Sequence, residues 1–210
     1  SGWEGGIRTN AIIYSPSLPS SVVQDGLFYV ADFLPTLNSL SNANFSLSAT
    51  IDGVDHSRLL MFNLPSQFSQ RKEVPTLDDV TGYYSYIYNN LKLLNGTSWG
   101  GQYDDWLGSN NNPSINSKTY EKSVLNSAVS KALDNPLTYK PFAVKRMRCQ
   151  ATVKCGLVPE RNRCNLLNGP CLFDISLDPC ERNDLSKTLP NAFNEMQTLF
   201  FENQLKKIVP

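Results

Sequence analysis

The chain has 210 residues, 40% of them hydrophobic, and its formal net charge at pH 7 is +0. A chain of this length can bury a sizeable core, and its charge balance gives no indication of a nucleic acid or an anionic membrane as a partner. A membrane-spanning helix requires about 20 consecutive apolar residues. No stretch approaches that length, because Asp32 and Pro35 interrupt the most apolar candidate, residues 26–40.

The N-terminal part of the sequence predicts one strand and one helix. Residues 10–14, Asn-Ala-Ile-Ile-Tyr, are typical of a buried strand. Pro35 predicts either a kink or a helix that begins at Asp32 or Phe33. The apolar side chains of this helix recur at helical spacing, and we interpret them as core packing. They are Leu27, Val30, Leu34, Leu37 and Leu40.

The middle of the chain predicts a β-hairpin. Residues 83–88 and 91–94 are rich in β-favouring side chains, and Asn89-Asn90 between them has the chemistry of a two-residue turn. Residues 59–64 are a further candidate strand, whereas the polar residues 66–80 are expected to form a loop. The tyrosines of the hairpin would contribute to one buried and one exposed face of a sheet; the alternative is a sugar-stacking surface.

Residues 95–141 are long and low in apolar content, and they contain two candidate cation sites. Asp104-Asp105 and Asp134-Asn135 offer the oxygen ligands that hard cations prefer. The alternative, which we favour, is that they are surface carboxylates. A short helix is expected over residues 123–133.

The C-terminal part predicts a strand followed by a helix. Residues 171–175 form a strand-length apolar run, and the β-rich residues 151–155 could pair with it. Residues 190–207 predict a helix that covers one face of the sheet, because its apolar stripe needs a partner. The stripe consists of Ala192, Met196, Leu199 and Phe200.

Five cysteines are present, so at least one is free or bonds outside this chain. If residues 151–155 pair antiparallel with residues 171–175, Cys155 comes opposite Cys171, and this is the preferred bridge. Cys164 with Cys180 is then the second pair. Cys149 remains free or bonds elsewhere. A Cys171–Cys180 bridge is disfavoured, because the extended run after Cys171 carries the chain too far for a disulfide.

Two glycosylation sequons, Asn44-Phe-Ser and Asn95-Gly-Thr, accompany the clustered cysteines. Together they favour a secretory or lysosomal compartment over a cytosolic protein with free thiols. His56 is the one histidine, and nothing marks a nucleophile for it, because no Gly-x-Ser-x-Gly motif occurs. We therefore expect an ordinary surface or loop role for His56 and no catalytic residue in the chain.

Five motifs occur in an order that resembles the sulfatase family, most closely arylsulfatase B-like (N-acetylgalactosamine-4-sulfatase-like) members from invertebrates. The N-terminal motif resembles the family's Glu-Gly-Gly-x-Arg loop, in which Glu4 and Arg8 would hold the loop. The last motif resembles the family's C-terminal signature. The five are Trp3-Glu-Gly-Gly-Ile-Arg8, residues 30–37, residues 51–55, residues 91–96, and Leu172-Phe-Asp-Ile175 with Asp178-Pro-Cys-Glu-Arg-Asn-Asp-Leu185.

The resemblance implies an α/β fold class, namely the C-terminal part of an alkaline-phosphatase-like sulfatase fold, with a small antiparallel sheet packed by a C-terminal helix. Residues 1–58 would end the large α/β domain. Residues 59–210 would form the antiparallel-sheet subdomain, with a long insertion at about 96–165. The implied partner is the N-terminal half of the same sulfatase, as a separate chain or a missing segment. In the family a lysine just before the Glu-Gly-Gly loop contacts the sulfate, and it would precede Ser1.

The resemblance also indicates which chemistry this chain lacks. Sulfatases make their formylglycine nucleophile from a Cys/Ser-x-Pro-x-Arg motif, and none of the five cysteines has that context. Calcium and its ligands are expected in the upstream half only. The chain would therefore hydrolyse sulfate esters, of aryl or glycosaminoglycan type, only together with that half. The alternative is a catalytically inactive sulfatase-like secreted protein with a structural, storage or interaction role.

One basic cluster stands out in the expected insertion. It could meet a sulfated glycan as substrate; the alternative is a solvated face with scattered charges. Its members are Lys145, Arg146, Arg148, Lys154, Arg161 and Arg163.

Overall fold

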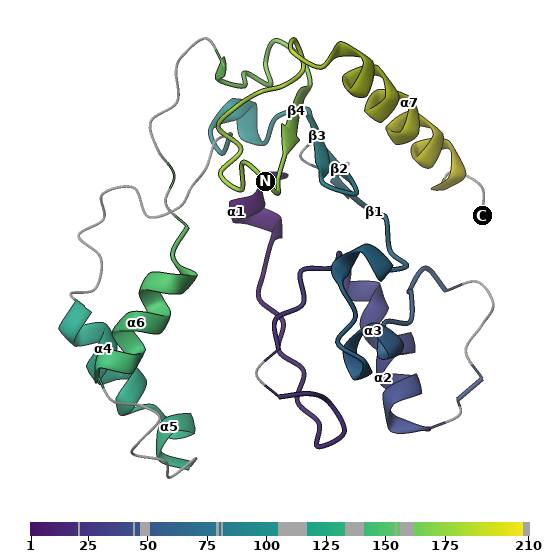
Figure 1. Cartoon of the computed structure of the whole chain (residues 1–210). Coiled ribbons are helices and arrows are strands. Elements are labelled where there is room, and N and C mark those ends of the chain that lie inside the picture. Colours follow the sequence, from purple (N-terminus) through teal and green to yellow (C-terminus); the bar gives the residue numbers. More distant parts are fainter. Residues whose placement is uncertain are drawn as a thin grey trace.

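The computed structural model describes residues 1–20, 22–43, 45–46, 51–78, 80, 82–104, 117–132, 141–153, 155 and 162–207. Figure 1 shows three groups of elements: N-terminal helices and loops, a small sheet with a long helix beside it, and three further helices to one side. The Glu-Gly-Gly loop folds as the short helix α1 (Glu4–Ile7), which lies next to the sheet.

A four-stranded antiparallel sheet is the centre of the C-terminal part. Its strands follow the chain in the order β1-β2-β3-β4. They are β1 (Glu73–Asp78), β2 (Tyr83–Tyr88), β3 (Leu91–Asn95) and β4 (Cys171–Asp174). The hairpin β2–β3 turns at Asn89-Asn90, as predicted, with Asn89 at a φ of 52°. The strand at 171–175 is also confirmed, although its partner is β3.

Two strand predictions around this sheet are wrong. Residues 66–80 were expected to form a loop, but β1 lies within them; its Pro75 is tolerated because β1 is an edge strand, where a missing N–H breaks no ladder bond. Residues 151–155 were expected to pair with β4. Instead Ala151 is the last residue of a helix, and the described residues that follow it form no strand.

Both faces of β3 and β4 are buried, which explains their nearly continuous apolar runs. On one face, Tyr86, Leu93 and Leu172 come into register and pack against the C-terminal helix. On the other face, Leu94 and Phe173 pack with a group from the N-terminal loop and the segment before β4, which includes Trp3, Leu166 and Cys171. The sheet therefore joins the two ends of the chain.

The C-terminal helix α7 (Pro190–Lys207) confirms the predicted helix and its role as a cover for the sheet. It begins at Pro190, where a missing N–H costs no helical hydrogen bond. Met196 and Phe200 are buried against Tyr86 and Leu172, and the rest of the stripe packs at the edge of this cluster. The fold prediction of a small antiparallel sheet packed by a C-terminal helix is thus confirmed.

The N-terminal part contains two helices that pack against each other. After the 3₁₀ turn η1 (Val30–Asp32), helix α2 (Phe33–Ser41) begins at Phe33, as predicted. Its partner is α3 (Ser57–Met61), and the 3₁₀ turn η2 (Ser66–Phe68) follows. The strand expected at 59–64 is therefore wrong, since most of that segment is helix or turn.

Two expectations of burial fail in this part of the chain. Residues 10–14 form no strand, and Ile12 and Tyr14 are 92% and 89% exposed. The stripe interpreted as core packing points to solvent instead: Val30, Leu34 and Leu37 are 71%, 59% and 48% exposed. The side of α2 that faces the protein holds the buried residues Pro35 and Thr36. The apolar side of this helix therefore has no cover within the described residues.

Three helices form a separate group within the expected insertion, after the 3₁₀ turn η3 (Trp99–Gly101). They are α4 (Ser117–Leu125), α5 (Ala128–Ala132) and α6 (Pro141–Ala151). The helix expected over residues 123–133 is thus divided between α4 and α5. Helix α6 packs on α4, where Val144 is buried and the Arg148 guanidinium lies 4.3 Å from the centre of the Tyr120 ring.

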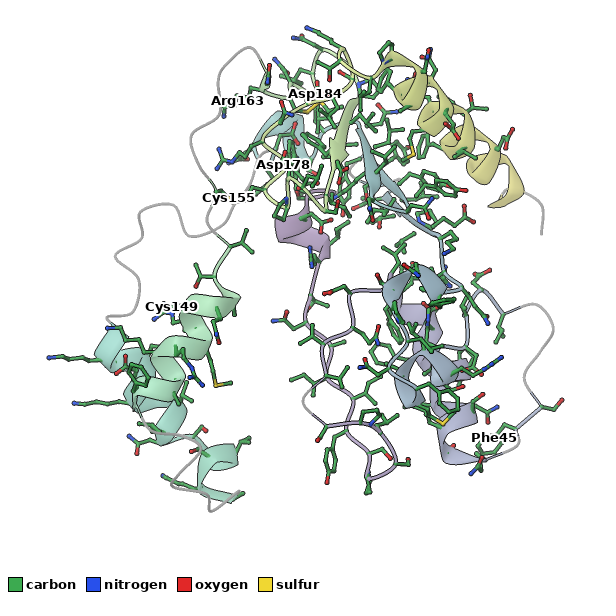
Figure 2. All side chains as sticks on the ribbon, in the orientation of Figure 1. Phe45, Cys149, Cys155, Arg163, Asp178 and Asp184 are labelled. Atoms are coloured by element: carbon green, nitrogen blue, oxygen red, sulfur yellow. A yellow bond between two sulfur atoms is a disulfide. The ribbon has the colours of Figure 1, made fainter. Side chains whose placement is uncertain are left out.

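The four cysteines expected to form disulfides do so, but with the other pairing. The bridges are Cys155–Cys180 and Cys164–Cys171, and Cys149 is free and exposed. The preferred pairing was wrong because it relied on a strand at 151–155 beside β4. Figure 2 shows Cys155 near the turn that contains Asp178, in agreement with the first bridge.

We predict that Phe200→Ala lowers the free energy of unfolding by about 3–5 kcal/mol, because Phe200 is 3% exposed and its truncation leaves a cavity against the sheet. The matched control is Phe201→Ala, since Phe201 is the next residue of the same helix and is 53% exposed. Urea denaturation followed by circular dichroism would measure both. Equal losses in the two variants would contradict the packing described for α7.

Candidate functional site

The first and last motifs of the sequence meet at a buried lysine of β3. Lys92 has no exposed surface, and its Nζ donates to Glu4 Oε1 at 2.8 Å and lies 2.6 Å from Glu181 Oε1. Glu181 Oε2 accepts the backbone N–H of Glu4 at 2.6 Å. An ammonium group can be removed from water only when it is paired and hydrogen-bonded. The Glu4–Lys92–Glu181 cluster therefore fixes the Glu-Gly-Gly loop to the sheet.

The turn that supplies Glu181 is held by its own acidic residues. Asp178 Oδ2 accepts the backbone N–H groups of Arg182 and Asn183 at 2.6 and 2.7 Å. Asp184 Oδ1 accepts the N–H of Leu172 at 3.0 Å and so joins the turn to β4. Figure 2 labels Asp178 and Asp184 on this turn. Glu181 itself has a φ of 52°, a left-handed conformation that costs energy in a residue other than glycine.

The charges of the cluster are not equal in number, because two carboxylates share one ammonium group. Burial raises the pKa of the Glu181 carboxyl, although the charge and the hydrogen bond of Lys92 act against this rise. Arg8 adds a second positive charge from the rim, with its Nη1 3.7 Å from Glu4 Oε2. The expectation that Glu4 and Arg8 hold the loop agrees with this geometry.

A cavity of about 500 Å³ lies beside the cluster. Its lining combines Trp3 with two arginines, Arg163 and Arg182, and with Asp104. Burial raises the pKa of the Asp104 carboxyl. The remaining lining residues are Gly101, Cys164, Asn165, Leu166, Leu167 and Glu181. This mixture of an aromatic face and charged groups suits a polar ligand, and it lies directly beside the Glu-Gly-Gly loop.

A second buried polar cluster holds the N-terminal helices. Arg71 binds the Asp32 carboxylate through Nε at 2.7 Å and Nη2 at 2.6 Å, and His56 Nε2 lies 3.2 Å from Asp32 Oδ2. Backbone N–H groups of Val54 and Tyr29 also donate to this carboxylate. Burial alone would raise the pKa of Asp32, but these hydrogen bonds and the charge of Arg71 lower it below its usual value.

This cluster corrects the expectation for His56. The residue is buried, not on the surface, and it precedes α3 at the N-cap position. Its backbone N–H donates to Thr36 Oγ1 at 3.0 Å, and its ring stacks near Phe28 with centroids 5.0 Å apart. These contacts give His56 a structural role. Arg71, which completes the cluster, carried no sequence signal beyond its charge.

The other predicted site residues are only partly described. Asn44, Asp105, Asp134, Asn135, Lys154 and Arg161 lie outside the described residues. Asn95 is half-buried at the end of β3, so its glycosylation stays a prediction. Tyr86 lies in the core and its hydroxyl donates to Glu73 Oε2 at 2.5 Å, which fits a sheet face better than a sugar-stacking surface.

In the described part of the chain, no three His, Cys, Asp or Glu side chains lie close enough to hold a metal ion. The location of calcium in an upstream half stays a prediction. Among the helices of the described ranges, none is long and apolar enough to cross a membrane.

The sequence was compared with known proteins. No family model matches the chain. Over 200 residues, which cover 92% of this chain, it is 28% identical to mouse (Mus musculus) arylsulfatase J. The chain resembles the C-terminal part of an arylsulfatase. It spans only 29% of the length of that relative. The resemblance inferred from the five motifs is thus confirmed.

A solved structure from Bacteroides thetaiotaomicron was also found, in work titled for the metabolism of multiple glycosaminoglycans. It aligns with 87% of this chain and 26% of its own, at a TM-score of 0.44 and 14% sequence identity.

We predict that Lys92→Met lowers the free energy of unfolding at pH 7 by about 3–5 kcal/mol, because two carboxylates are left buried without a cation. The control is Lys72→Met, since Lys72 is exposed. Urea titrations at several pH values would measure both.

The pH dependence of this loss separates electrostatics from packing. Burial raises the folded-state pKa of Glu181, so the folded variant binds more protons than the unfolded chain between the two pKa values. Its stability therefore falls as pH rises above the unfolded value of about 4.3, and it recovers on acidification. A deficit that stays constant from pH 4 to pH 7 would contradict the ion-pair role.

Proposed function

We propose that the chain is the C-terminal part of a sulfatase that hydrolyses aryl or glycosaminoglycan sulfate esters and works only with its upstream part. The observation that carries this proposal is the match to an arylsulfatase along 92% of the chain. The meeting of the first and last motifs at Lys92 supports it, because these motifs are far apart in the sequence and close in the structure.

The chain itself lacks the nucleophile of this reaction. No Cys/Ser-x-Pro-x-Arg motif occurs in the sequence, and four of the five cysteines are in disulfides. Formylglycine and calcium would supply the nucleophile and the charge stabilisation of the sulfate, and their residues would lie upstream. The contribution of this chain is then to position that machinery, not to perform the reaction.

The Glu4–Lys92–Glu181 cluster would position the upstream catalytic residues. It holds the residues around Glu4 at a fixed place on the sheet, and in sulfatases the lysine that contacts the sulfate lies just before this loop. The cavity lined by Trp3 and Asp104 lies beside the same loop. A rigid support for the sulfate-binding residue matters, because a small displacement of a catalytic group costs much of the rate.

The exposed apolar side of α2 supports an upstream partner. Leu34 and Leu37 lie three residues apart, so they share one face of α2, and the exposed Val30 precedes them in η1. Residues 10–14 add a β-favouring segment that no strand of the described residues pairs with. Apolar surface of this kind marks a protein interface. We propose that these two features together form the contact with the upstream α/β part, an interface face that residues 1–58 contribute.

The disulfides support a compartment for this function. The segment from Cys155 to Cys180 contains two disulfides. Disulfides form in oxidising environments, which fits a secreted or lysosomal protein. The alternative function is a catalytically inactive sulfatase-like secreted protein. The upstream sequence would distinguish the two, because loss of its Cys/Ser-x-Pro-x-Arg motif removes the nucleophile.

We predict that the isolated chain does not hydrolyse a chromogenic aryl sulfate, whereas the full precursor with its upstream part does. The matched control is the precursor in which the upstream motif Cys or Ser is replaced by Ala. Release of the chromophore by the isolated chain above a heat-inactivated sample would contradict the proposal. Absence of turnover by a folded precursor that carries the intact motif would favour the inactive alternative.

We predict that Leu34→Glu/Leu37→Glu abolishes association with a separately expressed upstream part, because two charges would be buried in an apolar contact. The matched control is Ser41→Glu, which adds a charge at an exposed position of the same helix. Size-exclusion chromatography with light scattering would measure the complex. A complex that persists in the double variant would contradict the proposed face.

A further inference from the structure

The net charge of zero conceals a strong separation of charge along the chain. The described residues 117–132 and 141–151, which contain helices α4, α5 and α6, carry six cations and one carboxylate, which gives +5, so the remainder of the chain carries −5. The cations are Lys118, Lys122, Lys131, Lys145, Arg146 and Arg148, and the carboxylate is Glu121. We name this group the basic helical group.

The arrangement of these cations is fixed by helix packing. Helix α6 is anchored on α4 by the buried Val144 and by Arg148, whose guanidinium lies over the Tyr120 ring. Lys145 and Arg146 lie between Val144 and Arg148 on the same helix, and both side chains are exposed. Figure 2 shows side chains that project outward around this group, with Cys149 labelled on α6.

Arg148 packs on the Tyr120 ring, but Lys145 and Arg146 of α6 make no ion pair within the described part of the chain. The ion pairs found among the described residues hold the N-terminal helices and the Lys92 cluster, and none of them involves Lys145, Arg146 or Arg148. Three cations within four residues repel one another, and they stay together at a cost unless an anion binds them. The exposed Lys145 and Arg146, placed beside Arg148, therefore indicate an anionic ligand.

We propose that the basic helical group is a docking surface for a sulfated polysaccharide, separate from the cluster at Lys92. Sulfate groups stay charged at any physiological pH, and a polysaccharide repeats them along its length, so several cations can bind at once. Arginine binds such oxyanions through two parallel N–H groups. Helical order keeps the cations in place before binding, which lowers the entropic cost of the contact.

The chemistry favours a sulfated glycan over a nucleic acid. The disulfide-bonded segment from Cys155 to Cys180 follows α6 directly, and disulfides persist in compartments where polyanions are mainly glycans. The inference does not depend on catalytic activity, so it stands or falls apart from the proposed function.

The test is binding of the disulfide-bonded chain to heparin in solution over a series of salt concentrations. The variant is Lys145→Gln/Arg146→Gln, in which both side chains are exposed. The control is Arg58→Gln/Lys187→Gln, which removes one lysine and one arginine from exposed positions outside the basic helical group. Thermal unfolding of all three proteins would check that the fold is kept.

We expect the Lys145/Arg146 variant to bind heparin roughly tenfold more weakly, which corresponds to about 1.4 kcal/mol. The slope of log Kd against log salt should fall by about two, because two fewer counterions are released. The control should bind as the unchanged chain does. Equal losses in variant and control would overturn the proposal.

Two comparison ligands define the partner. Desulfated heparin should bind much more weakly than heparin, because the contacts require sulfate. A single-stranded DNA of similar charge should also bind more weakly. DNA binding as tight as heparin binding, or no heparin binding at 0.15 M salt, would overturn the assignment to a sulfated polysaccharide.

Discussion

The buried ion cluster at Lys92 is the interaction on which the rest of the structure depends. Its three charged residues come from the N-terminal loop, the third strand and the turn after the fourth strand, so one ammonium group joins segments up to 177 residues apart. A buried charge is stable only while its partners stay in place. Displacement of either glutamate would weaken the pairing of charges in the core, so the cluster disfavours structures in which the three segments are not together. The strained backbone of Glu181 is tolerated because that residue makes three contacts at once.

The cluster around Asp32 holds helix α2 in place although the apolar side of this helix is exposed to solvent. Asp32 accepts hydrogen bonds from Arg71 and from two backbone N–H groups, with His56 beside it. These polar contacts bind α2 to α3 and to the segment before β1. The apolar residues of α2 can stay exposed because polar contacts on the opposite side of the helix attach it to the protein. A helix that is held in this way can expose a hydrophobic face, as a part that joins a larger assembly would need.

The sequence allowed prediction where the local signal agreed with the tertiary structure. Helix α7 and the β2–β3 hairpin were found because their periodicity and turn chemistry match what the packing requires. Residues 10–14 and 59–64 were interpreted as strands from their composition alone. A strand needs a partner, but the described residues pair no strand with the first segment, and the second is mostly helix and turn. The edge strand β1 was missed because residues 66–80 are polar and were therefore interpreted as a loop. Lys92 was missed because a single lysine in an apolar run is usually exposed, and only the positions of Glu4 and Glu181 show that it is not.

Because positive and negative charges are separated along this chain, its net charge cannot exclude an anionic partner. A total of zero gave no indication of an anionic partner, yet the basic helical group alone carries +5. Electrostatic attraction acts over about one Debye length, roughly 8 Å at physiological salt, so a ligand responds to the local patch and not to the total. The carboxylates that offset this charge lie elsewhere in the chain; two of them, Glu4 and Glu181, are buried with Lys92 and do not screen α6. Net charge therefore becomes informative only once the fold shows which charges are buried in pairs and which remain exposed together.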